Sequence, residues 1–277
     1  MIVPRNASGV ATRSPSAVTW ALRLWLALVL LFIFSPLMVV AVLSFNESPY
    51  GTLPFVFSLG WYERLFAQRN LLIATLWDLE LSIAVAVSAT ILGTLLAIWM
   101  KRVSGRVALP VHAALVSAMT IPWLLLGVGM LLVLRQLGLG RSVTSMYLGC
   151  LAVALPYVVF IVRARLDALD SVVEEAALSL GASWLQVFLR VTAPLISSAA
   201  MAGGFMAFVT CFNNFVIQYF LAPIGFRTLP LEIYTMVKMG YKPDINALGT
   251  ILVAIAVMLV VLLQKLTGNA SKLLMAK

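Results

Sequence analysis

Long stretches without a charged side chain constrain this sequence more than any other feature. Six charge-free intervals of 20 to 36 residues lie along the chain, at 24–46, 81–100, 107–134, 142–162, 191–226 and 245–264. Each is long enough for the ~17–25 residues that an α-helix needs to cross a bilayer. Only 10% of the 277 residues are charged, whereas a soluble domain carries roughly 25%. The sequence therefore predicts an all-α integral membrane protein with six transmembrane helices.

Two charge-free intervals need a separate interpretation. The interval 191–226 is too long for one transmembrane helix and too short for two with a loop. We expect it to begin with an interfacial segment near Pro194 and to end in the turn at residues 222–225, which has the sequence Ala-Pro-Ile-Gly. The interval 48–62 is predicted to be a loop, because two prolines and two glycines interrupt it.

The positions of lysine and arginine indicate how the chain is oriented in the membrane. If the N-terminus is cytoplasmic, 12 of the 19 basic residues lie on inner segments and 7 on outer segments. This positive-inside bias predicts that both termini are cytoplasmic. The expected organisation is a cytoplasmic tail at 1–20, a six-helix domain at 21–266 and a second tail at 267–277. The formal net charge of +9 follows from this topology, and no basic patch with interleaved aromatic residues points to nucleic acid.

The longest inner connection, residues 163–194, contains an apolar segment that is too short to span the membrane. The charge-free interval that follows Glu175 has 14 residues, a length typical of an interfacial or buried helix. Ser171 and Glu174 form an S-x-x-E capping box, and a carboxylate in the first turn of a helix is favoured by the helix dipole. Gly181 occupies the position at which a left-handed residue ends a helix. A separate short helix is therefore predicted here.

One face of this short helix is expected to be apolar. Its apolar residues recur at helical spacing: Val173, Ala176, Ala177 and Leu180. Ser183 and Gln186 form a second capping box, which predicts another helix that Pro194 closes. The result is a helix-turn-helix element at the inner membrane surface. Composition alone leaves two interpretations open: the apolar face lies on lipid headgroups, or its small alanines allow a protein partner to approach closely.

The pattern within this element resembles the E-A-A-x-x-x-G signature of binding-protein-dependent ABC importer permeases. The matching residues are Glu175, Ala176, Ala177 and Gly181. The family pattern continues with I-x-L-P, for which residues 191–194 keep the spacing and the proline but not the isoleucine and the leucine. In that family this loop is a coupling helix that docks into a cleft on a cytoplasmic ATPase. The resemblance implies a type I importer permease fold and assigns ATPase coupling to Glu174, Glu175, Ala176, Ala177, Leu180, Gly181, Ala182 and Pro194.

Further segments resemble the spermidine/putrescine branch of these permeases. They are residues 34–37, 44–46, 227–238 and 243–248, and the resemblance covers most of residues 30–265. It implies a multi-pass protein of the bacterial inner membrane that works with several partners. These are a second permease subunit of similar fold, two cytoplasmic ATPase subunits and a periplasmic or extracellular solute-binding protein.

The chemistry that the chain lacks is as informative as its motifs. No lysine is followed by serine or threonine, so a G-x-x-x-x-G-K-[ST] phosphate loop cannot exist. ATP and Mg are therefore expected in the partner ATPase, and the chain is predicted to be no enzyme and to hold neither cofactor nor metal. His112 is expected either to serve in packing or to lie at the membrane interface, and Cys150 and Cys211 are expected to be small buried hydrophobic residues. Spans nearly free of ionisable groups weigh against a proton- or ion-coupled carrier. The alternatives are a stand-alone secondary carrier or channel, and a membrane scaffold without transport activity.

A substrate path needs polar and aromatic groups at membrane depth, and residues 210–220 are the densest such cluster. The candidate path residues are Phe212, Asn213, Asn214, Gln218 and Tyr219, with Trp123 from the third predicted helix. Asparagine in hydrocarbon is costly unless it finds partners, so these side chains either bond to neighbouring helices or line the path. Asn214 and Gln218 lie four residues apart and share a helix face, whereas Asn213 lies about 100° away.

The polyamine branch typically carries acidic residues at the Asn213 and Asn214 positions and after the proline of the third helix, where this chain has Pro122 and Trp123. We therefore expect a small polar organic solute that is less cationic than a polyamine, such as a polyamine-like, amino-acid-derived or sugar-conjugated compound. Asp78 and Glu80 are expected to lie at a solvated end of the second helix.

Overall fold

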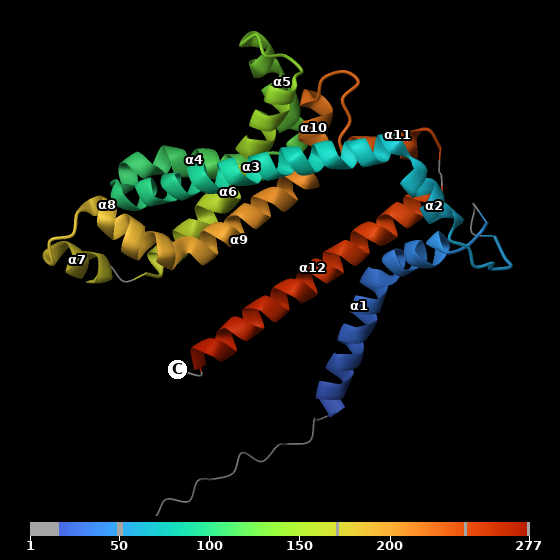
Figure 1. Cartoon of the computed structure of the whole chain (residues 1–277), viewed down its shortest axis with the longest axis horizontal. Coiled ribbons are helices and arrows are strands. Elements are labelled where there is room, and N and C mark those ends of the chain that lie inside the picture. Colours follow the sequence, from blue (N-terminus) through green and yellow to red (C-terminus); the bar gives the residue numbers. More distant parts are fainter. Residues whose placement is uncertain (1–16, 49–51, 170–171, 241–242, 276–277) are drawn as a thin grey trace, which may run out of the picture. The chain divides into compact units, whose positions relative to one another are not determined.

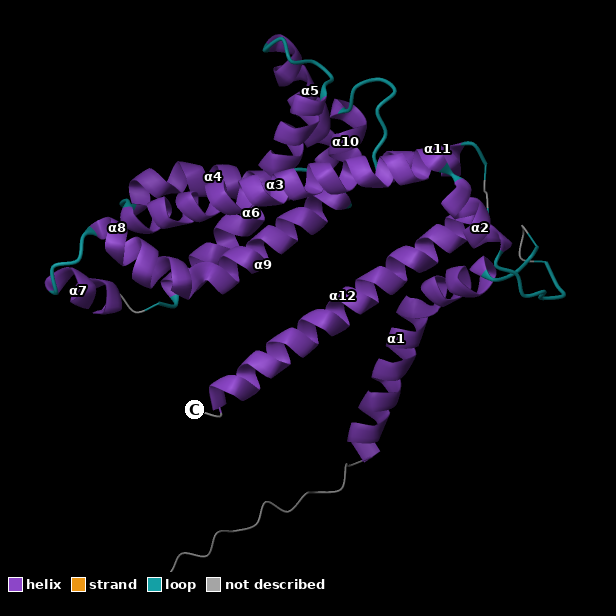
Figure 2. Ribbon diagram, in the orientation of Figure 1, coloured by secondary structure: helices purple, strands orange, loops and turns teal. Residues whose placement is uncertain are grey.

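The computed structural model describes residues 17–48, 52–169, 172–240 and 243–275. Helices dominate these residues, and the only extended pairing among them is an isolated bridge between Asn46 and Phe57 (Figures 1 and 2). The chain divides into two compact units, Met1–Ala67 together with Tyr241–Lys277, and Gln68–Gly240. The prediction of an all-helical chain is confirmed.

The first unit contains three helices: α1 (Ala17–Ser44), α2 (Gly60–Ala67) and α12 (Asp244–Met275). α12 contacts both α1 and α2. The predicted loop at 48–62, of which residues 49–51 lie outside the described part, is tied to the end of α1 by hydrogen bonds. Trp61 Nε1 donates to the Asn46 carbonyl at 2.7 Å, and the Val56 N–H donates to Asn46 Oδ1 at 3.2 Å. Residues 52–59 are therefore held in a defined shape outside any helix, whereas residues 60–62 of the predicted loop belong to α2.

The second unit is built on three long helices that lie side by side, α3 (Arg69–Arg102), α6 (Val143–Asp167) and α9 (Ala193–Phe212) (Figure 1). Around them lie α4 (Gly105–Thr120), α5 (Trp123–Gln136), α7 (Val172–Ser179), α8 (Trp184–Val187), the π-helical turn η1 (Phe188–Thr192), α10 (Phe215–Leu221) and α11 (Leu229–Lys238). α4 packs on α6, α11 packs on α3, and α10 packs between α5 and α6.

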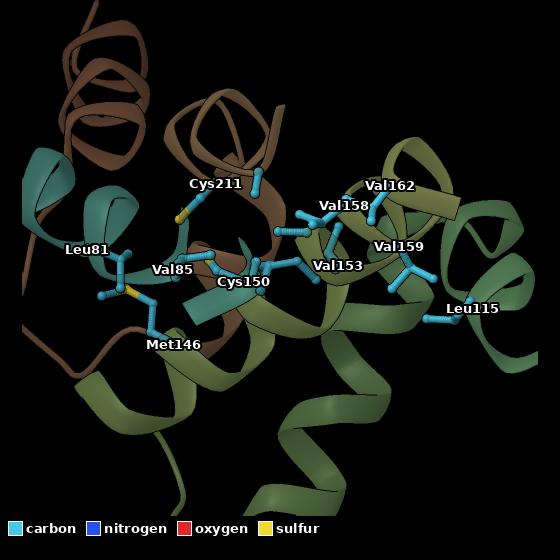
Figure 3. Close-up of a cluster of buried hydrophobic side chains, with 14 of the residues drawn as sticks. Leu81, Val85, Leu115, Met146, Cys150, Val153, Val158, Val159, Val162 and Cys211 are labelled. Carbon is cyan, nitrogen blue, oxygen red and sulfur yellow. The ribbon is translucent and has the colours of Figure 1, made fainter. Parts of the chain in front are cut away.

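Small residues let the three long helices approach closely. Val158 of α6 is fully buried (Figure 3), and a Cβ atom added to Gly93 of α3 would lie 2.8 Å from Val158 Cβ. A Cβ added to Gly203 of α9 would lie 3.1 Å from Val158 Cα. Such small residues are typical of helix interfaces inside membranes. Cys150 and Cys211 are buried free thiols of the same core, as we predicted.

Four helical runs in the described residues are long and apolar enough to cross a membrane: Val18–Ser44, Arg69–Arg102, Val143–Asp167 and Trp184–Phe212. α4 and α5 make a fifth candidate if they count as one broken span. They cover the interval that we expected to form a single helix, yet they meet at an angle of 117°. Ile121 and Pro122 are both non-helical there, with ψ of 132° and 128°. Proline disfavours the helical conformation in the residue before it, which explains the break.

Pro194 does not close a helix, contrary to our prediction. It lies in the first turn of α9, and the run from Trp184 to Phe212 is continuous through η1. The Ala193 N–H donates to the Phe188 carbonyl, five residues earlier, which is the π-helical pattern. Proline has no N–H to donate, and its ring clashes with the preceding turn of a regular α-helix. The wider turn before Pro194 accommodates it.

Candidate functional site

α7 is a short helix with a complete C-terminal cap. Gly181 has φ +88°, its N–H donates to the Leu178 carbonyl at 2.9 Å, and the Ala182 N–H donates to the Ala177 carbonyl at 3.2 Å. These are the two bonds of a Schellman motif, which needs a left-handed residue at the position of Gly181. The helix end predicted from the sequence is confirmed. The expected N-terminal box cannot be compared, because Ser171 lies outside the described residues.

The apolar face of α7 is open. None of its residues is buried, Val173 is 50% exposed, and Leu180, just beyond the helix, is 89% exposed. Ala176 is exposed and Ala177 is partly buried. An exposed apolar stripe on a well-capped helix requires a partner or a lipid surface to cover it.

α7 and the start of α9 are joined by a hydrogen bond that the sequence reasoning missed. Thr192 Oγ1, on a side chain that is only 2% exposed, donates to Glu174 Oε1 at 2.7 Å. The second predicted capping box is present, with the Ser183 N–H donating to Gln186 Oε1 at 2.9 Å. Thr192 occupies the unspecified position of the I-x-L-P pattern. A polar residue within an apolar run was the sequence feature that could have indicated this hydrogen bond. The first turn of α7 is therefore fastened to the end of η1, while the Ser183 box caps the start of α8.

Further contacts attach this element to the long helices. The Arg102 guanidinium lies 4.9 Å from the centre of the Trp184 ring, a cation–π contact. Lys101 Nζ donates to the Leu166 carbonyl at 2.8 Å, and Arg165 Nε donates to the Leu195 carbonyl at 3.2 Å. These bonds join the ends of α3 and α6 to each other and to the first turn of α9. The Arg102–Trp184 contact thus also attaches α8 to the end of α3.

The substitution Thr192→Val tests the bond between Thr192 and Glu174. Valine keeps the shape but removes the donor, so the partly buried Glu174 oxygen loses its partner. We expect solute uptake per ATP hydrolysed to fall about 3- to 10-fold in proteoliposomes, since a part-buried hydrogen bond contributes about 0.5–1.5 kcal/mol. Thr192→Ser keeps the hydroxyl donor and should restore the uptake per ATP hydrolysed. Ser179→Ala removes another local hydroxyl bond, to the Glu175 carbonyl, and serves as the control. If Thr192→Val and Ser179→Ala gave the same solute uptake per ATP hydrolysed, the bond between Thr192 and Glu174 would have no role in coupling.

The polar segment between α9 and α10 interrupts the fifth predicted span. Asn213 and Asn214 separate the two helices. Asn214 is fully buried and caps α10, its Oδ1 accepting from the Ile217 N–H at 3.0 Å. Asn213 is exposed, and its Nδ2 donates to the Val209 carbonyl at 3.1 Å. The two asparagines thus supply the polar partners that a helix break inside a membrane protein requires.

Gln218 is the centre of a buried polar cluster. Its Nε2 donates to Asp78 Oδ1 at 3.1 Å and to the Cys211 carbonyl at 2.9 Å, and its Oε1 accepts from the Thr228 hydroxyl. The side chains of Asp78, Gln218 and Thr228 are all fully buried. The cluster connects α3, the end of α9, α10 and the residue before α11.

The buried position of Asp78 contradicts our expectation of a solvated helix end. We drew the helix boundary at the first charged residue, but α3 begins at Arg69 and carries Asp78 well inside. Its partner Gln218 lies 140 residues further along the chain, so no local pattern could reveal the contact. Glu80, two residues later, is exposed as expected.

The other candidate path residues lie among aromatic side chains. Phe212 stacks on Phe208 with ring centres 5.6 Å apart. Tyr219 is 42% exposed, contacts the Tyr234 ring at 5.6 Å and lines a groove of 610 Å³. Trp123 begins α5 and packs, partly buried, against the core. His112 is exposed, and its ring lies edge-on to Phe160 with ring centres 5.4 Å apart.

Helices long and apolar enough to cross a membrane, with a short, exposed and capped helix attached at one end, define an integral membrane protein. The chain belongs to the family described as binding-protein-dependent transport system inner membrane component, whose model matches residues 89–267. It is the permease subunit of a binding-protein-dependent ABC importer of the bacterial inner membrane. It is not an enzyme, since ATP is bound and hydrolysed by a separate subunit.

Similar proteins agree with this assignment. The spermidine/putrescine transport system permease protein PotC of Haemophilus influenzae is 32% identical over 236 residues, which cover 85% of this chain and 92% of PotC. The putrescine transport system permease protein PotI of Escherichia coli is 30% identical over 228 residues, covering 80% of this chain and 81% of PotI. A solved bacterial ABC transporter involved in the import of the acidic polysaccharide alginate has a TM-score of 0.67 at 16% identity, covering 95% of this chain and 99% of that one. This last likeness supports the fold.

Proposed function

We propose that the chain forms one half of the membrane pore of its importer, with a second permease of similar fold as the other half. In this proposal six spans cross the membrane, formed by α1, α3, the α4–α5 pair, α6, the α8–α9 run and α12. Both termini and the tails 1–20 and 267–277 lie in the cytoplasm. Two ATPase subunits bind the inner face, and a solute-binding protein docks outside.

The observation that carries the proposal is the exposed, capped helix α7, fastened to α9 through Glu174 and Thr192. An ATPase cleft that covers the face of Ala176 and Ala177 buries the apolar surface that α7 exposes when the chain is alone. When ATP closes the ATPase pair, α7 follows, and the hydrogen bond passes the displacement to η1 and α9. Coupling requires that the ATPase contact differ in free energy between the inward- and outward-facing states.

The proposed solute is a small polar organic compound, polyamine-like, amino-acid-derived or sugar-conjugated, and less cationic than a polyamine. The names of PotC and PotI favour the polyamine side of this range. The chemistry of the helix break favours fewer charges on the solute. Asn213 and Tyr219, the exposed candidates, are neutral, and Asp78 is buried with one oxygen bonded to Gln218.

Reconstitution tests the function and the solute separately. We expect the chain, its partner permease and the ATPase to purify as one complex whose ATP hydrolysis rises when loaded binding protein is added. Solute uptake by the chain alone, without ATPase, would instead establish a secondary carrier or channel. Calorimetry of the binding protein with spermidine, putrescine, amino acids and sugar conjugates tests the solute. High affinity for spermidine or putrescine would overturn the proposed lower charge.

A further inference from the structure

α11 lies at the end of α3 that is opposite to α7 and α8 (Figure 1). Residues of α11 line a groove of 610 Å³. The loop after α10 and one side of α11 form its walls. Phe226 from this loop contacts the ring of Trp77 in the first part of α3, with centres 5.2 Å apart. The last residue of α3, Arg102, instead lies over Trp184 of α8. The groove is therefore separated by most of the length of α3 from α7 and α8, which together form the proposed coupling element.

α11 has the properties of a helix that lies on a surface. Its 10 residues make it about 15 Å long, too short to cross the ~30 Å hydrocarbon core. On one face of α11, the side chains of Leu229, Leu231 and Met236 are buried. Tyr234 and Lys238 line the groove and are exposed. One face of α11 thus holds the helix in place, and the other is available to a partner.

The groove is positively charged. Arg141, Arg227 and Lys238 line it, and none of the described lining residues carries a carboxylate. Arg227 Nη1 is paired with Glu232 Oε2 at 2.9 Å. Within the described residues no salt bridge involves Arg141 or Lys238. These two side chains therefore give the groove a net positive potential.

The positive charge at Arg141 is held in a fixed position. Its Nε donates to the Ala222 carbonyl at 2.9 Å and its Nη2 to the Tyr219 carbonyl at 3.2 Å. The rings of Tyr219 and Tyr234 line the same groove and meet edge to face, with their centres 5.6 Å apart. The two residues are 42% and 38% exposed. Arginine and tyrosine are enriched at the centres of protein interfaces, because they offer large, rigid contact area together with hydrogen bonds.

We propose that this groove is the docking surface for an acidic side chain on the solute-binding protein. The inference rests on the proposed function, which puts the end of α3 farthest from the coupling helix on the outer face. A carboxylate entering between Arg141 and Lys238 would meet two cations, while the tyrosines would contact its apolar stem. A preformed positive groove speeds association with an acidic partner and orients it.

Charge reversal at Lys238 tests the proposal in the complete importer, reconstituted in nanodiscs with its own loaded binding protein. The concentration of binding protein that half-maximally stimulates ATP hydrolysis is measured. We expect Lys238→Glu to raise it about tenfold at 50 mM salt and by less at 300 mM, because exposed charges are screened by salt. The maximal rate at saturation should not change. Arg135→Glu, an exposed reversal in the last turn of α5 that does not line the groove, is the control and should shift the value less than about twofold.

Each other outcome has a definite meaning. Equal shifts in the two variants would show a general effect of charge and overturn the docking surface. A lower maximal rate with an unchanged half-saturating concentration would place the groove on the path of the solute, which also overturns it. If loaded binding protein fails to stimulate the unmodified importer, the proposed function itself is wrong.

Discussion

Replacing Gly181 by valine is expected to reduce ATP-driven solute uptake at least about tenfold while the chain still inserts into the membrane. Gly181 has φ +88°, and its Schellman bonds set the direction in which the chain leaves α7. A left-handed conformation costs an L-residue about 1–2 kcal/mol, and more if it is β-branched. The helix end must then rearrange, and each 1.4 kcal/mol changes the population of the docking-competent form tenfold. Uptake into proteoliposomes and the amount of inserted protein are the two measurements.

Gly138→Val is the matched control for this prediction. Gly138 also has positive φ, +78°, and open space around it, but it follows α5 and has no part in the coupling element. The two variants therefore carry similar backbone strain at different sites. Normal uptake by Gly181→Val, or an equal loss in both variants, would show that α7 is not the contact that drives transport.

Replacing Gln218 by leucine is expected to lower the thermal stability of the protein more than any other substitution described above. Leucine has a similar size but leaves Asp78 Oδ1, the Cys211 carbonyl and the Thr228 hydroxyl without their bonds to Gln218. A buried polar group that loses its partner costs about 1–3 kcal/mol, whereas an average substitution costs about 1 kcal/mol. The midpoint of thermal unfolding in detergent should therefore fall by several degrees.

Asn213→Ala provides the comparison from the same helix break. Asn213 is exposed and bonds within its own turn, so its removal should change the midpoint by no more than a degree or two. Similar midpoints for Gln218→Leu and Asn213→Ala would mean that the buried cluster does not hold α9, α10 and α3 together.

The coupling element could be predicted from the sequence because its determinants are local. Caps, a left-handed glycine and apolar spacing act within one or two turns, and the structure confirms the end of α7 at Gly181 and the box at Ser183. The turn at residues 222–225 was predictable for the same reason, with Gly225 at φ +84°.

The remaining features depend on contacts that no local pattern records. Asp78 can be buried because Gln218, far along the chain, donates a hydrogen bond to its carboxylate. Pro194 continues a helix because the preceding turn widens, and Pro122 breaks one because the residue before it becomes extended. The charge-free intervals located the apolar helices but gave the wrong helix ends. For example, α3 begins at Arg69 and not after Asp78, because a charged residue that finds a partner does not end a helix.

The close packing around Val158 has a mechanical consequence. Gly93 and Gly203 approach it from opposite helices, and each has little room for even one additional carbon atom. If α3 slid along α6 by one residue, the side chain of Leu92 or Thr94 would replace Gly93 at this point and collide with Val158. Sliding of α3 along α6 is therefore opposed in both directions, so these two helices keep their register and move as a pair.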